Sequence, residues 1–130
     1  MSKYTEKAME LRNTICPNCA ETIMMVYAED MGLTTEQAAA IGTNFGGGMK
    51  TGSICGAVTS ALIVMGALGI SDPKSVSELQ RTIKENHNGL INCVDLIKAN
   101  AEAGWQKKTH CDAMICEAIE IIEEFRVKYK

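Results

Sequence analysis

Residues 54–70 constrain the fold more than any other part of this 130-residue chain, because the segment contains no charged residue. A helix that is apolar on every side is either buried by its neighbours or inserted in a membrane. This segment is slightly short for a membrane span and includes Thr59, Ser60, Gly66 and Gly69. We therefore expect a central apolar helix over about residues 54–70, covered by other helices, and no membrane insertion.

The rest of the chain has helical spacing of its hydrophobic residues and no sustained strand-like alternation. We expect helices over about residues 18–31, 34–41, 72–86 and 109–129, a short helical segment over 5–15, and a helix or turn over 92–100. Capping signals support several starts, such as Thr34 followed three residues later by Gln37. The prediction is one all-α domain over residues 1–130, a compact bundle of about five to six helices around the central apolar helix.

Composition excludes some function classes. The net charge is −3 and the pI is about 5.4, with basic residues grouped only at Lys107-Lys108 and in the tail from Arg126 to Lys130. This gives no sign of a nucleic-acid footprint, so we expect no nucleic-acid partner. The first residues lack the apolar core of a secretion signal, and we expect a cytoplasmic location.

Six cysteines are the main chemical feature of the chain: Cys16, Cys19, Cys55, Cys93, Cys111 and Cys116. The cytoplasm keeps thiols reduced, so a static disulfide framework is not expected. Metal binding or reversible redox chemistry explains so many cysteines better. The alternative is that several of them are simply small buried hydrophobic residues.

A glycine loop, residues 46–52, leads into Cys55 and the apolar segment. Three consecutive glycines are costly to order, which predicts left-handed backbone angles or a close backbone approach. Cys55 lies where a helix should begin, and a helix N-terminus favours the reactive thiolate. A phosphate-binding loop does not fit, because Met49 separates Gly48 from Lys50-Thr51 and no strand precedes the loop.

The spacing Cys16-Pro17-Asn18-Cys19 brings two sulfurs within disulfide or shared-metal range at the start of a helix. A thioredoxin-like use of this motif needs a preceding strand, which is not expected here. A zinc site built from two such motifs is not indicated either, because Cys111 and Cys116 are spaced too widely.

The histidines and the acidic residues give little further indication of function. We expect His87 to be solvated and give His110 no role in the site, although His110 directly precedes Cys111 and could lower its pKa or act as a ligand. The acidic run in the last helix, Glu117, Glu120, Glu123 and Glu124, is interpreted as a solvated face, without the Glu-x-x-His spacing of di-iron bundles.

Several motifs, in order along the chain, resemble the C-GCAxxG-C-C family of redox-active proteins. They are Asn18-Cys19-Ala20, Phe45-Gly46-Gly47-Gly48-Met49, Cys55-Gly56-Ala57-Val58-Thr59-Ser60-Ala61-Leu62, Ile91-Asn92-Cys93 with Leu96, and Cys111 with Ile115, Ala118 and Glu120. The resemblance covers about residues 5–125. It implies a small helical protein with four characteristic cysteines, here Cys19, Cys55, Cys93 and Cys111, and a redox or metal-linked role.

Each of these four cysteines is expected at or near the start of a different helix, which would allow them to converge on one pocket. Four thiolates there would suit a tetrahedral metal or an iron–sulfur cluster. Two pairs could equally cycle between dithiol and disulfide. Gly47, Gly48 and Gly56 are the expected cofactor-binding positions, where backbone N–H groups would bond sulfur and tune it.

The chain departs from the family pattern at three positions. Ser60 stands where the family motif has glycine, so a close helix contact there is expected to be looser. Cys16 and Cys116 match no family cysteine, which suggests that they are local additions.

Three functional hypotheses follow. The first is a cytoplasmic redox protein whose four cysteines form an electron-transfer centre, either as iron–sulfur ligands or as thiol/disulfide pairs, with a redox partner of unknown identity. The second is a non-catalytic metal-binding module, holding zinc or another soft ion. The third is a structural helical homodimer in which the cysteines are packing residues. The sequence does not decide whether the protein is an enzyme.

Overall fold

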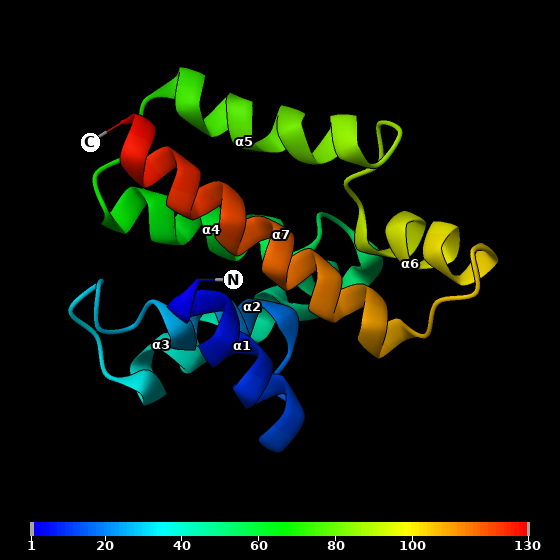
Figure 1. Ribbon diagram of the computed structural model, residues 1–130, viewed down its shortest axis with the longest axis horizontal. Coiled ribbons are helices and arrows are strands. Elements are labelled where there is room, and N and C mark those ends of the chain that lie inside the picture. Colours follow the sequence, from blue (N-terminus) through cyan, green and yellow to red (C-terminus); the bar gives the residue numbers. More distant parts are fainter. Residues whose placement is uncertain (1, 130) are drawn as a thin grey trace.

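Seven α-helices account for most of residues 2–129, the part of the chain that the computed structural model describes (Figure 1). They are α1 (Lys3–Thr14), α2 (Cys19–Val26), α3 (Thr35–Gly42), α4 (Gly56–Ala67), α5 (Pro73–Asn86), α6 (Cys93–Glu102) and α7 (Lys107–Lys128). These residues contain no strand, so the predicted all-α class is confirmed. The helices outnumber the expected five to six, because the first segment and residues 93–102 are both full helices.

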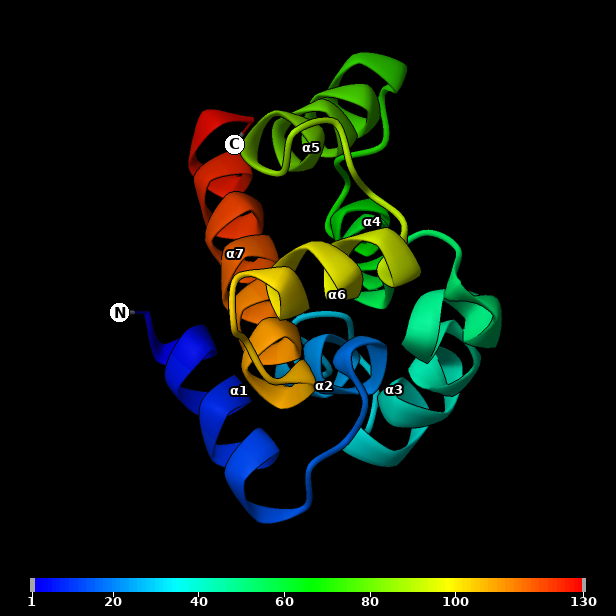
Figure 2. The same cartoon turned by 90° about the vertical axis from the view of Figure 1, so that its right-hand side faces the viewer.

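Helix α7 crosses the molecule diagonally in Figure 1, with α5 on one side of α4 and α7 and with α1, α2 and α3 on the other. It contacts α1, α2, α4 and α6. Figure 2, turned by 90°, shows α6 in front of this packing, close to the first turns of α7 and α4. Segments far apart in the sequence therefore meet at the end of the molecule where α6 lies.

The expected central apolar helix is present as α4, although it is shorter than the predicted segment over residues 54–70. Val58, Ala61, Val64 and Met65 are fully buried, because α2, α5 and α7 pack around the helix. Burying an aliphatic side chain of this size contributes about 1.5–3 kcal/mol, which explains why an uncharged segment stays inside the fold. No helix within residues 2–129 is long and apolar enough to cross a membrane.

Helix α2 shares the central position, since every one of its residues except Glu21 is buried. The predicted helix over residues 18–31 is too long: α2 ends at Val26, and turns follow as far as Gly32, which has a φ of 74°. Beyond that end, the buried Tyr27 stacks on Tyr4 with ring centroids 4.6 Å apart. The turn therefore places an aromatic anchor between α1 and α2.

Local side-chain signals set several helix starts. A reciprocal capping box of Asn18 and Glu21 begins α2, and the predicted box of Thr34 and Gln37 begins α3. Pro17 was expected within the first helical turn, but it lies one residue before the Asn18 cap. The start of α2 is therefore defined by Asn18, with Cys19 as its first helical residue.

Helix α7 buries the expected stripe of Ala118, Ile122 and Phe125. The prediction that the acidic run is a solvated face is wrong for two of its residues, which bond side chains at the ends of α5 and α2. Glu117 pairs with His87 at 2.8 Å, and Glu123 accepts a 2.7 Å hydrogen bond from the Tyr27 hydroxyl. His87 is therefore half-buried and bonded, where a solvated side chain was expected.

A short antiparallel bridge between Ile54 and Asn92 joins the segments that precede α4 and α6. The Cys55 N–H donates to the Ile91 carbonyl at 3.0 Å, and the Cys93 N–H donates to the Ser53 carbonyl at 2.6 Å. The bridge therefore sets the starts of α4 and α6 side by side, together with their cysteines.

The glycine loop contains a left-handed turn, which confirms the backbone prediction. Gly47, Gly48, Met49 and Lys50 have consecutive φ values of 66°, 64°, 58° and 60°. A left-handed conformation costs a non-glycine residue about 1–2 kcal/mol, so Met49 and Lys50 are strained. The Ser53 N–H closes the turn on the Gly48 carbonyl at 2.9 Å.

We expect Gly48→Ala to destabilise the protein by about 2 kcal/mol more than Gly47→Ala. The two glycines have nearly the same φ, but a Cβ at Gly48 would lie 2.6 Å from the Ser53 nitrogen, whereas a Cβ at Gly47 would meet nothing within 4 Å. The free energies of unfolding in urea measure the difference. Equal losses for the two variants would contradict this account of the loop.

Candidate functional site

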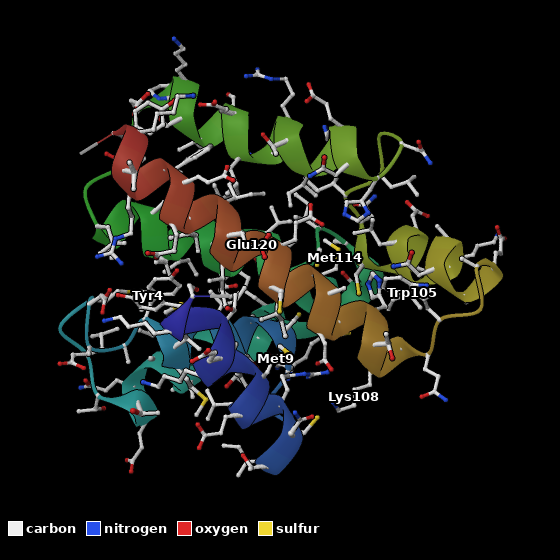
Figure 3. All side chains as sticks on the ribbon, in the orientation of Figure 1. Tyr4, Met9, Trp105, Lys108, Met114 and Glu120 are labelled. Atoms are coloured by element: carbon white, nitrogen blue, oxygen red, sulfur yellow. The ribbon has the colours of Figure 1, made fainter. Side chains whose placement is uncertain are left out.

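A cavity of about 310 Å³ lies where the starts of α2, α4, α6 and α7 meet. Five of the six cysteines line it: Cys16, Cys19, Cys55, Cys93 and Cys111. Lys108 and Met114 of α7, both labelled in Figure 3, also line the cavity and locate it at the α6 end of the molecule. Since Cys16, Lys107 and Lys108 line the cavity and are exposed, it opens to solvent on their side.

The structure brings the four predicted site cysteines together. Cys19 is the first residue of α2, Cys55 is the N-cap of α4, and Cys93 is the first residue of α6; all three are buried. Cys111 lies in the second turn of α7 and is half-buried. The expected convergence of helix starts is therefore present, while the catalytic role of the four residues stays a prediction.

Cys19 and Cys55 are bonded neighbours whose pKa values shift in opposite directions. The Cys55 thiol hydrogen-bonds the Cys19 sulfur, and this bond lowers the pKa of Cys19 most. Backbone N–H donors from Gly47 and Ala20 and the charge of Arg12 act in the same direction. Together they outweigh the effect of burial and lower the pKa of Cys19 to about 6. The same bond, with burial and the negative charge of Cys19, raises the pKa of Cys55 well above its ordinary value. Cys19 is therefore the nucleophilic member of the pair, and Cys55 keeps its proton.

This assignment corrects the expectation that the helix start would activate Cys55. Cys55 does receive the Ala57 N–H at the start of α4, which lowers its pKa, but its bond to Cys19, its burial and the negative charge of Cys19 raise that pKa by more. Cys19 receives the backbone N–H of Ala20 in the first turn of α2 and also the N–H of Gly47 from the glycine loop. The loop thus activates the cysteine of a different helix from the one it precedes.

The three predicted glycines have three different roles in the geometry. Gly47 lines the cavity and donates to the Cys19 sulfur, while Gly48 shapes the left-handed turn. Gly56 makes room for the sulfur, because a Cβ there would lie 2.7 Å from the Cys19 Sγ and 2.6 Å from the Phe45 carbonyl oxygen. Cofactor binding by these positions stays a prediction.

Cys93 and Cys111 are protonated neighbours of the pair. Burial and the charge of Cys19 raise the pKa of Cys93, and the same two causes raise that of Cys111. Lys107 acts in the opposite direction on both thiols. These two cysteines are therefore weaker nucleophiles than Cys19 at neutral pH.

Arg12 was missed by the sequence reasoning and lies at the site. It is buried, and its guanidinium donates to the Asp112 carboxylate at 2.6 Å and to the Pro17 carbonyl oxygen at 2.6 Å. The sequence did contain one indication that Arg12 would be buried. It follows Ala8 by four residues and therefore lies on the face of the first helix that was expected to be buried. A charge on such a face indicates a paired or functional group.

The position of His110 corrects a prediction, because no role in the site was expected for this residue. It is only 2% exposed, lines the cavity, and its Nδ1 lies 2.6 Å from the Asn100 side-chain nitrogen. Because the amide nitrogen is a donor, Nδ1 accepts, and the proton of the neutral ring is on Nε2. Burial, together with the charge of His87, lowers the pKa of His110, so the ring is neutral at pH 7.

The donor set does not fit a preformed metal centre. Within the described part of the chain, no three His, Cys, Asp or Glu side chains are arranged so that they could hold a metal ion. Cys19, Cys55, Cys93 and Cys111 line one cavity without the tetrahedral closeness that a structural zinc site requires.

The two cysteines outside the family pattern differ in position. Cys16 is exposed at the rim of the cavity and adopts a φ of 46°, with its N–H bonded to the Leu11 carbonyl oxygen at 2.9 Å at the end of α1. Cys116 is on α7 and does not line the cavity. Of these two additions, Cys16 alone has access to the site.

The fold and the site define a small helical protein with a cysteine-based reactive cavity. A family profile described as "Putative redox-active protein (C_GCAxxG_C_C)" matches residues 17–125, and the chain belongs to this family. The matched region contains Cys19, Cys55, Cys93 and Cys111 and begins just after Cys16. No curated protein and no solved structure matches the chain.

The Ser60 departure is accommodated within α4. Its side chain is fully buried and donates to the Gly56 carbonyl oxygen at 2.6 Å. The serine hydroxyl is therefore satisfied inside its own helix and needs no partner from α2.

We expect Gly56→Ala to displace the Cys19 sulfur, because the added methyl group would overlap it. The Cys19 thiol should then lose donors that stabilise its thiolate, and its alkylation rate at pH 7 should fall by about tenfold. Peptide mass spectrometry after iodoacetamide treatment measures this rate.

Gly66→Ala is the matched control in the same helix, since a Cβ there meets nothing within 4 Å. It should leave Cys19 alkylation unchanged and stabilise the helix by up to about 1 kcal/mol. The account of Gly56 is wrong if both variants alkylate Cys19 at the native rate.

Proposed function

We propose that the protein is a thiol–disulfide redox protein in which Cys19 and Cys55 cycle between a dithiol and a disulfide. The observation that supports this function is the buried pair itself: one sulfur is held as a thiolate by the proton of the other. A nucleophilic thiolate with a protonated partner in contact is the arrangement that thiol–disulfide exchange requires.

The reaction begins when the Cys19 thiolate attacks one sulfur of a disulfide substrate. A mixed disulfide forms at Cys19, and the first substrate thiolate leaves. Cys55 then gives its proton to the departing thiolate, and its sulfur attacks the Cys19 Sγ. The Cys19–Cys55 disulfide forms, and the second half of the substrate leaves as a thiolate that takes a proton from water. Two electrons have then passed from the protein to the substrate.

Neighbouring groups support these steps without taking part in bond formation. The N–H groups of Gly47 and Ala20 and the charge of Arg12 stabilise the attacking thiolate. A dithiol reductant returns the Cys19–Cys55 disulfide to the starting state by the reverse exchange. That reductant is the redox partner that the proposal requires.

The metal-binding alternative uses the same four cysteines and therefore needs a separate test. It is less well supported, because the described side chains do not provide three ligands in a suitable arrangement. If the cysteines were only packing residues of a homodimer, the opposite pKa shifts of Cys19 and Cys55 would have no function. The homodimer stays a prediction.

The first test is the pH dependence of Cys19 alkylation. The rate should rise with pH to a plateau with its midpoint near the Cys19 pKa of about 6, because only the thiolate reacts. Cys55→Ala removes the donor to the Cys19 sulfur, so the midpoint should move to higher pH. Cys55→Ser keeps an O–H donor, and its midpoint should lie below that of Cys55→Ala. A native midpoint near the ordinary thiol value of about 8.5 would contradict the pair.

The second test is disulfide mapping of protein purified without air and then oxidised by one equivalent of a small disulfide. Digestion should give one dominant linked pair of peptides, containing Cys19 and Cys55. Cys93→Ser should leave this link intact, whereas Cys55→Ser should stop the reaction at the Cys19 mixed disulfide.

Elemental analysis of the same anaerobic preparation separates the alternatives. Stoichiometric iron or zinc that is lost in the Cys19→Ser, Cys55→Ser, Cys93→Ser and Cys111→Ser variants would overturn the dithiol proposal in favour of a metal centre. A metal-free protein that forms no Cys19–Cys55 link would favour the structural alternative.

A further inference from the structure

The charge around the cavity is one-sided. Three basic residues line it, Arg12, Lys107 and Lys108, and no carboxylate of a described residue is among the lining groups. The nearby Asp112 binds both Arg12 and Lys108, at 2.6 Å and 3.0 Å. Lys107 makes no ion pair with any described residue, so the mouth retains a cationic excess.

The remaining polar groups of the cavity are mostly occupied by the fold. The Asn18 side chain accepts from the Glu21 N–H at 2.8 Å and donates to the Thr43 carbonyl oxygen at 3.2 Å. His110 uses Nδ1 for Asn100, which leaves its Nε2–H as a neutral donor. Three basic side chains outnumber the one anionic group of the described wall, the Cys19 thiolate, so the cavity suits an anionic guest better than a cationic one.

The size of the cavity limits what can reach Cys19. A volume of about 310 Å³ is at the lower end of the range for small-molecule sites. Cys19 is 7% exposed, so a disulfide on the surface of a folded protein would be held away from its sulfur. A cavity of this volume is suited to a small-molecule disulfide.

We propose that the oxidising substrate is a small-molecule disulfide that carries carboxylate groups, bound by Lys107 and Lys108 at the mouth while its S–S bond reaches Cys19. This inference depends on the dithiol–disulfide cycle proposed above and specifies its substrate class. In the balanced reaction, one disulfide, the reduced Cys19–Cys55 pair with its single proton and one proton from water give two substrate thiols and the protein disulfide. The two lysines are positioning residues, since they touch the substrate's carboxylates and not the reacting sulfurs.

Three disulfides of similar length and different charge test the proposal: dithiodipropionate with two carboxylates, the neutral bis(hydroxyethyl) disulfide, and cystamine with two ammonium groups. The rate of Cys19–Cys55 disulfide formation in the full-length protein is divided by the rate of each reagent with a free neutral thiol. At low salt we expect the normalised rate for dithiodipropionate to exceed that for cystamine by about tenfold or more. The ratio should shrink as salt is added.

Lys107→Gln should lower the normalised dithiodipropionate rate by about threefold to tenfold and leave the neutral disulfide unaffected. Lys84→Gln removes an exposed lysine of α5, which does not line the cavity, and should change neither rate. Far-ultraviolet circular dichroism confirms that both variants remain folded.

The outcomes separate the two proposals. If the Cys19–Cys55 disulfide forms at equal normalised rates with all three reagents, or faster with cystamine, the substrate class is wrong and the dithiol cycle stands. If no reagent produces that disulfide in folded, reduced protein, the dithiol cycle is wrong, and the inference about its substrate is wrong with it.

Discussion

The contact between the Cys19 sulfur and Gly56 is the constraint on which the site depends. Helices α2 and α4 are both central to the core, and their first turns meet where Cys19 and Gly56 face each other. Any side chain at Gly56 would occupy the space of the sulfur. Because protein cores are close-packed, the apolar burial of the two helices holds Cys19 against the start of α4. Core packing and sulfur chemistry are therefore coupled at one contact.

Two backbone devices complete the site from segments that are distant in the sequence. The bridge between Ile54 and Asn92 ties the start of α6 to that of α4. The left-handed turn of the glycine loop directs the Gly47 N–H to the Cys19 sulfur. Strained non-glycine residues such as Met49 and Lys50 persist only where the surroundings over-determine them. The strained turn follows Gly47 directly, the residue whose N–H reaches the Cys19 sulfur.

The sequence predicted the helical class, the burial of most of the apolar helix and the convergence of four cysteines, because each depends on patterns within one segment or on family spacing. It did not predict that Cys19 would be the activated cysteine. That outcome depends on donors from Gly47 and Cys55, which reach Cys19 only through tertiary packing. Local reasoning about a helix start favoured Cys55, since it could count backbone N–H groups but not the neighbours of the folded chain.

Arg12 and His110 are two further residues whose place in the site could not be predicted from local sequence patterns. Both are buried beside the sulfurs, and each is held by a partner on another helix, Asp112 of α7 for Arg12 and Asn100 of α6 for His110. An arginine can be buried only when its charge is compensated, and the carboxylate that compensates it is one hundred residues away. Asp112 neutralises part of the positive charge around the cavity, but Lys107 forms no ion pair with a described residue. The cavity therefore has the buried Cys19–Cys55 pair inside and an excess of positive charge at its mouth. In the proposed cycle the two parts of the cavity would have separate tasks: the interior sets the reactivity of the Cys19 sulfur, and the basic rim selects the disulfides that reach it.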